Sequence, residues 1–174
     1  MRLCIQHTPP WLLARQVWGN KVDDECVGVF ATALCNGALP HVSALLLDRN
    51  EITDVGVEAL ALALRLGAMN QLNSLNLAFN RIGDAGLRAL AAAAVSAGAL
   101  ASCRTLDLAS NLISDAGLQE LAGLLRRAKG ALLPQLTVLH LSGNPAGEAG
   151  MKALAGALPK HVVQGKVAIG AMTV

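Results

Sequence analysis

The chain has 174 residues, enough for one domain with a sizeable core, and it carries a formal net charge of only +2. This charge balance gives no long-range attraction to nucleic acid or to an anionic membrane, and no segment has the composition of a signal peptide or a transmembrane helix. Hydrophobic residues make up 53% of the sequence but aromatic residues only 2%, so we expect aliphatic layers of the kind that repeat proteins build. The default expectation is a protein of the cytoplasm or the nucleus.

An asparagine recurs in one frame along the chain, about every thirty residues. Around it the sequence follows L-x-x-L-x-L-x-x-N-x-I-x-D-x-G-x-x-x-L, and four copies in register are a specific sign of a repeat architecture. The asparagines are Asn20, Asn50, Asn80, Asn111 and Asn144. We therefore divide a single domain over 1–174 into an atypical first repeat (12–41), four regular repeats (42–71, 72–102, 103–135 and 136–159) and a tail (160–174).

The first repeat follows this pattern imperfectly. Its helical part matches the later repeats, but Cys26 stands where they have glycine, and Arg15 stands where they have the first leucine of the strand. Terminal repeats of solenoids are commonly atypical, because they face a neighbour on one side only.

Each regular repeat predicts a strand, a turn and a helix. Leu75 and Leu77 are two residues apart, so they point to the core face of a short strand. Asn80 ends that strand, and its amide can bond the backbone of the turn and of the neighbouring repeat, forming a ladder. Asp84 and its counterparts Asp54 and Asp115 fall where a helix begins, and we expect them to accept hydrogen bonds from its free N–H groups. The missing side chain of Gly86 lets adjacent helices approach closely.

These blocks resemble the ribonuclease-inhibitor-like leucine-rich repeats, as found in NOD-like receptors, Ran GTPase-activating proteins and tropomodulins. The resemblance covers roughly residues 12 to 158. It implies an α/β solenoid, a right-handed βα superhelix with a curved parallel sheet on the concave face and helices on the convex face. Such a resemblance specifies the fold and leaves the partner open.

The tail leaves the asparagine frame after Leu158. Val167 and Ile169 are two residues apart, at the distance from Leu154 expected for another strand. We expect an edge strand there, which closes the sheet without a following helix.

The candidate working surface is the concave face, formed by the strand positions that point away from the core and by the turns that follow them. A protein partner is the expected ligand, with Trp18 as an aromatic anchor. The partner-binding candidates are Trp18, Leu46, Asp48, Arg49, Asn76, Asp107, His140 and Ser142, accompanied by Gln16, Ala78, Phe79, Ala109 and Ser110. For Phe79 the alternative is that it packs into the turn and belongs to the core.

The sequence contains no phosphate loop, nucleophile elbow, zinc spacing or paired catalytic carboxylates, so we expect no enzyme activity, cofactor or metal. The four histidines are scattered over different units. Two alternatives to a protein-interaction module stay open. One is a GTPase-activating protein of the Ran type, with Arg49 or Arg81 as the functional arginine. The other is a structural scaffold that self-associates through its solenoid ends or its convex helices.

None of the four cysteines forms a C-x-x-C pair, and free thiols such as that of Cys103 suit a reducing compartment. Cys103 occupies a position that other repeats fill with leucine or valine, so we expect a small buried hydrophobic side chain. A disulfide between Cys26 and Cys35 is the alternative for that pair.

Overall fold

Helices and short strands alternate along the computed structural model, which describes residues 21–37, 42–97, 99–128 and 133–158. The predicted features at Trp18, at Asn20 and in the tail 160–174 lie outside these described residues. The element order is α1 (Asp24–Cys35), β1 (Ala44–Leu46), α2 (Asp54–Arg65), β2 (Ser74–Asn76), α3 (Asp84–Ala97), β3 (Thr105–Asp107), α4 (Asp115–Arg127), β4 (Val138–His140) and α5 (Glu148–Ala155).

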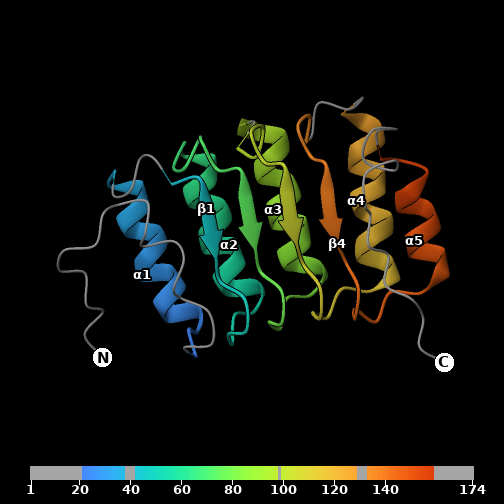
Figure 1. Cartoon of the computed structure of the whole chain (residues 1–174), viewed down its shortest axis with the longest axis horizontal. Coiled ribbons are helices and arrows are strands. Elements are labelled where there is room, and N and C mark those ends of the chain that lie inside the picture. Colours follow the sequence, from blue (N-terminus) through green and yellow to red (C-terminus); the bar gives the residue numbers. More distant parts are fainter. Residues whose placement is uncertain (1–20, 38–41, 98, 129–132, 159–174) are drawn as a thin grey trace.

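The four strands form one parallel sheet in chain order, and the helices pack against one another in a layer along one side of it (Figure 1). Each strand is followed by a helix that returns the chain to the start of the next strand, the connection that parallel pairing requires. The expected leucine-rich-repeat solenoid is therefore confirmed. We keep the name concave face for the side of the sheet that carries no helices.

The core lies between the sheet and the helix layer. The central leucines of the strands pair in register across the sheet, and all four are buried: Leu45, Leu75, Leu106 and Leu139. Helical residues spaced three and four apart, such as Leu118, Leu121 and Leu125, face them. Cys103 is fully buried among these side chains as expected, and burial raises the pKa of its thiol to about 11.

Four of the predicted ladder asparagines make the same kind of contacts, and Asn80 shows the pattern. Its Nδ2 donates to the carbonyl oxygens of Leu47 in the preceding repeat (2.9 Å) and Leu77 in its own (3.0 Å). Its Oδ1 accepts from the backbone N–H of Ile52 at 3.1 Å. Because Asn80 is 8% exposed, these bonds satisfy backbone groups that water does not reach. Equivalent bonds are made by Asn50, Asn111 and Asn144.

The expectation that each aspartate caps its own helix is wrong. Thr53, just before Asp54, has the extended backbone of a capping residue, and its Oγ1 accepts from the backbone N–H of Val55. Asp54 is already the first helical residue, and its Oδ1 instead accepts from the N–H groups of Gly83 (2.7 Å) and Gly86 (2.9 Å) in the next repeat. The aspartates therefore join successive helices, forming a second ladder beside that of the asparagines.

The glycine of each repeat makes room for the aspartate of the preceding one. A Cβ atom on Gly86 would lie 2.7 Å from Asp54 Oδ1, and one on Gly150 would lie 2.5 Å from Asp115 Oδ1. Cys26 holds the same position in α1, is exposed, and is contacted by no aspartate of another repeat among the described residues. Among the described residues, a side chain at this position therefore meets no clash of the kind that a Cβ on Gly86 would meet.

Candidate functional site

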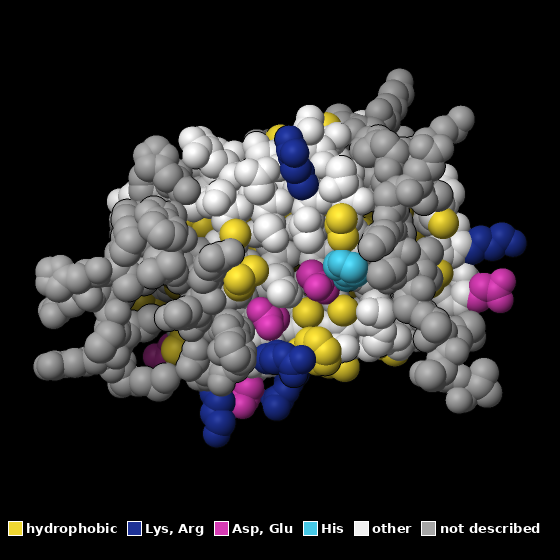
Figure 2. All heavy atoms as spheres, in the orientation of Figure 1, with side chains coloured by type: hydrophobic (Ala, Val, Ile, Leu, Met, Phe, Trp, Pro, Cys, Tyr) yellow, Lys and Arg dark blue, Asp and Glu magenta, His cyan; other side chains and the backbone are white. Residues whose placement is uncertain are grey.

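The outward strand positions form a continuous row across the concave face. Pairing in the sheet aligns Leu46, Asn76, Asp107 and His140, and each of these residues is partly exposed. Asp48 and Ser142, two residues further along their repeats, are also partly exposed, whereas the equivalent Ala78 is buried. Figure 2 shows acidic, apolar and histidine side chains gathered over the strands, with several basic side chains at the lower edge of this view and another at the upper edge.

Hydrogen bonds hold the middle of this row in place. Asn76 Oδ1 accepts from the backbone N–H of Ala78 at 3.0 Å, and Asp107 Oδ1 accepts from that of Ala109 at 3.0 Å. Asn76 Nδ2 also donates to Asp48 Oδ1 at 3.3 Å, which links two neighbouring repeats. The polar side chains are thus oriented before any partner arrives.

The residue before each ladder asparagine has a left-handed backbone. The φ angle is 57° at Arg49, 56° at Phe79, 54° at Ser110 and 73° at Gly143. For a residue with a side chain this conformation costs roughly 1–2 kcal/mol. The sheet holds it there, because the N–H of Arg49 donates to Ala78 O (2.9 Å) and that of Phe79 to Ala109 O (2.8 Å).

This backbone turns Phe79 outward. The alternative that Phe79 packs into the core is wrong, because its side chain is 48% exposed. The guanidinium of Arg49 lies over its ring, 4.4 Å from the ring centroid, in a cation–π contact. Sequence reasoning placed Arg49 on this surface but missed the pair, because no spacing rule shows which way a side chain leaves a left-handed turn.

The charges on this face are available to a partner. Asp48 and Asp107 make no ion pair with any other residue that the structure describes. Arg81, the second arginine considered for a GTPase-activating role, lies 3.9 Å from Glu51 in an exposed pair. The concave face therefore combines carboxylates over the strands with an arginine and an aromatic ring at the turn.

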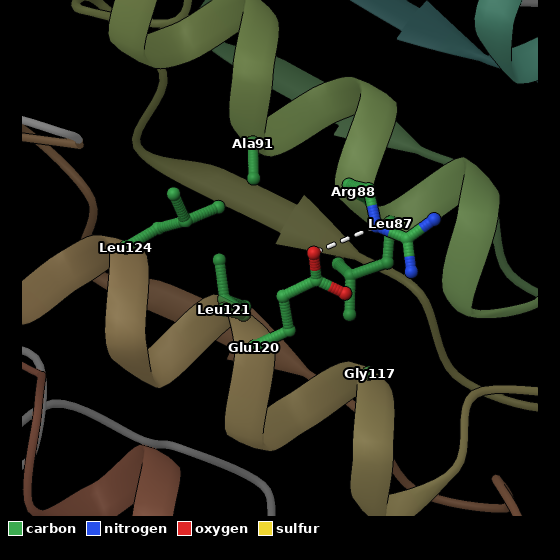
Figure 3. Close-up of a pocket in the computed structure, with 7 residues that line it drawn as sticks. All are labelled: Leu87, Arg88, Ala91, Gly117, Glu120, Leu121 and Leu124. Carbon is green, nitrogen blue, oxygen red and sulfur yellow. Dashed lines mark hydrogen bonds and ion pairs between the residues drawn. The ribbon is translucent and has the colours of Figure 1, made fainter.

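A shallow notch on the helix side is lined by Leu87, Arg88, Ala91, Gly117, Glu120, Leu121 and Leu124, with a volume of about 140 Å³ (Figure 3). Across it Arg88 Nε donates to Glu120 Oε1 at 2.7 Å, and this bond raises the pKa of Arg88 and lowers that of Glu120. The volume of about 140 Å³ includes open solvent, and small-molecule sites usually exceed about 300 Å³, so this notch is too small for one.

Membrane-spanning helices and metal clusters are both absent from the part of the chain that the structure describes. No helix there has the length and apolar character to cross a membrane. No group of three or more histidine, cysteine or acidic side chains is placed to hold a metal ion there.

Comparison with known proteins identifies the repeats. A family model described as Leucine Rich repeat matches residues 38–61, 69–91, 104–122 and 133–155, about half of the chain. A search of curated proteins finds no match. A solved structure named "Leiomodin-1 Actin-Binding Site 2 (ABS2)" is similar with a TM-score of 0.58 and 19% sequence identity, covering 85% of this chain and 79% of that one. At that identity the likeness shows the fold alone, whereas the four matched repeats show the family: the chain belongs to the leucine-rich-repeat family.

Proposed function

We propose that the chain binds a protein partner on its concave face and has no catalytic role of its own. The observation that carries this proposal is the contact between Arg49 and Phe79 at the end of the aligned strand row. Arginine and aromatic side chains, phenylalanine among them, are enriched in protein interfaces relative to the rest of the protein surface. Here both are held on a hydrogen-bonded turn, so little conformational freedom is lost on binding.

The size of the strand row requires the turn to take part. Four strands about 4.8 Å apart and three residues long present a projected area of only about 150 Å². A standard interface covers about 800 Å² on each partner. A partner that docks here must therefore reach from the strands onto the turns that carry Arg49 and Phe79.

The charges suggest what the partner presents. The carboxylates of Asp48 and Asp107 favour a basic side chain over the strands, and the ring of Phe79 favours an apolar or aromatic group beside it. Actin is the first protein to test, because the similar leiomodin structure is named as an actin-binding site.

The test is an affinity capture that compares the wild type with an Arg49→Ala/Phe79→Ala/Asp107→Ala variant. All three side chains are exposed or half-exposed, so the variant should keep the circular dichroism spectrum of the wild type. The matched control replaces exposed residues of the helix side, Gln119→Ala and Arg126→Ala. Purified actin and cell lysate serve as separate sources of partner.

A protein that is retained by the wild type and the control but lost by the concave-face variant supports the proposal. If that protein is actin, the wild type and the helix-side control should co-sediment with actin filaments, and the concave-face variant should not. Equal capture by the concave-face variant and the wild type would place the binding surface elsewhere and refute the proposal.

A further inference from the structure

Large apolar side chains lie along the outward side of α2, from its first turn to the C-cap residue Leu66. Val55, Leu62 and Leu66 are 65%, 53% and 67% exposed. At 3.6 residues per turn, seven residues are close to two turns and four residues slightly more than one, so the three side chains form one stripe. Because α2 lies in the helix layer beside the sheet (Figure 1) and these three side chains are exposed, the stripe is on the solvent side of that layer.

The same positions carry polar or small side chains in the two helices that pack against α2. The equivalents in α1 are Glu25, Thr32 and Asn36, and those in α3 are Ala85, Ala92 and Ser96. The repeat fold therefore does not require leucine there. Exposed side chains of this size in one contiguous stripe are typical of an interaction surface.

Two charged residues flank the stripe on one side only. Each residue of a helix is rotated by about 100° around the helix axis from the one before it. Viewed along that axis, Glu58 and Arg65 lie about 40–60° to one side of Leu62. The apolar Val55 and Leu66 lie about 20–40° to the other side. Neither Glu58 nor Arg65 is ion-paired with another residue that the structure describes. Being seven residues apart, they cannot satisfy each other within one helix.

We infer that this stripe pairs with the same stripe of a second copy of the chain, with the two α2 helices antiparallel about a two-fold axis. Leu62 then meets Leu62 of the second copy, and Val55 lies near Leu66 of the second copy. A two-fold axis perpendicular to the plane of the two helices keeps both charged flanks on the same side. Glu58 of each copy therefore meets Arg65 of the other, twice per dimer.

This arrangement joins the two molecules through their helix layers, so it leaves both concave faces open and directed away from each other. The dimer would be bivalent for whatever partner the concave face takes. The inference does not depend on the proposed function, because it uses none of the concave-face residues.

The first test is sedimentation equilibrium of the full chain over a concentration series from about 1 μM to about 1 mM, a range that covers weak interfaces. The mass of the wild type should rise from 17.9 kDa towards twice that value. Leu62→Glu should remain monomeric with an unchanged circular dichroism spectrum. The matched control Gly123→Glu, at the equivalent position of α4, should dimerise as the wild type does.

The second test exchanges the flanking charges. Glu58→Arg puts two arginines together at both contacts, and we expect it to weaken the dimer about tenfold. Adding Arg65→Glu restores opposite charges and should return the dissociation constant to near the wild-type value. The inference is overturned if the wild type is monomeric at every concentration or if Leu62→Glu dimerises as well as the wild type. It is also overturned if the double variant dimerises as weakly as Glu58→Arg alone.

Discussion

Replacing Gly86 with alanine tests the ladder of aspartates that joins successive helices. The new Cβ would lie 2.7 Å from Asp54 Oδ1 and 2.8 Å from Ile82 Cγ2, both shorter than real contacts allow. The helices must move apart, and Asp54 then loses the hydrogen bonds that it accepts from the N–H groups of Gly83 and Gly86.

The magnitude follows from two opposing effects. A hydrogen bond to a charged group contributes about 1.5–3 kcal/mol, and two are disturbed here, both only partly buried. Alanine is favoured over glycine inside a helix by about 1 kcal/mol, which offsets part of the loss. We expect Gly86→Ala to lower the free energy of unfolding by about 2 kcal/mol, a fall in Tm of about 4–8 °C for a chain of this length.

The assay is urea unfolding followed by circular dichroism, with Gly123→Ala as the matched control. A Cβ on Gly123 meets only the Nη2 atom of Arg127, at 3.8 Å, so this change should stabilise the protein by about 1 kcal/mol. In an Asp54→Ala background Gly86→Ala should cost less, because the closest clashing atom is gone. If Gly86→Ala stabilises the protein as much as Gly123→Ala does, the reasoning about this contact is wrong.

Three further results are expected. Asn80→Ala should destabilise the protein by about 1–3 kcal/mol in the same urea assay, because its buried backbone partners lose their bonds; an unchanged midpoint would contradict this. Leu108→Ala should lower the free energy of unfolding by about 2–5 kcal/mol, whereas Asp107→Ala should leave it nearly unchanged. Equal losses for the two variants would mean that the core and outward faces of the strand are assigned the wrong way round. Alkylation at pH 8 mapped by mass spectrometry should label exposed Cys35 and spare Cys103, whose thiol has a pKa near 11 and stays protonated and buried below that value; labelling of Cys103 in the folded protein would refute the burial.

The repeat frame of the sequence was sufficient to predict the fold. Leucines two residues apart could only be buried on one face of a strand, and Leu75 and Leu106 are buried there. The recurring asparagine predicted a ladder, and Asn80 bonds both its own turn and the preceding repeat. These features are periodic, so a single sequence contains several copies of the same signal.

The aspartate contacts could not be predicted in the same way. The position of Asp54 at a helix start is compatible both with capping its own helix and with reaching the next one. The choice depends on Thr53, whose extended backbone already supplies the cap, and on the space beside Gly86. Such a distinction requires the distance between two repeats, which the sequence does not contain.

The sequence left the outward position of Phe79 open for a different physical reason. A phenylalanine next to a buried asparagine suggests packing into the turn on hydrophobicity alone. The left-handed backbone at this residue reverses the direction of its side chain, and the guanidinium of Arg49 then covers the ring. Neither the backbone angle nor the neighbour thirty residues away is visible in the local sequence.

The central claim, that the concave face binds a protein, is tested most directly by the dissociation constant of the captured partner. Phe79→Ala should raise this dissociation constant about 30-fold, which corresponds to a loss of about 2 kcal/mol of binding free energy for an aromatic anchor. Leu112→Ala removes a side chain of similar exposure, 58%, directly after the ladder asparagine Asn111. It should change the dissociation constant less than about twofold. Equal dissociation constants for the wild type and Phe79→Ala, or a larger effect of Leu112→Ala, would contradict the claim.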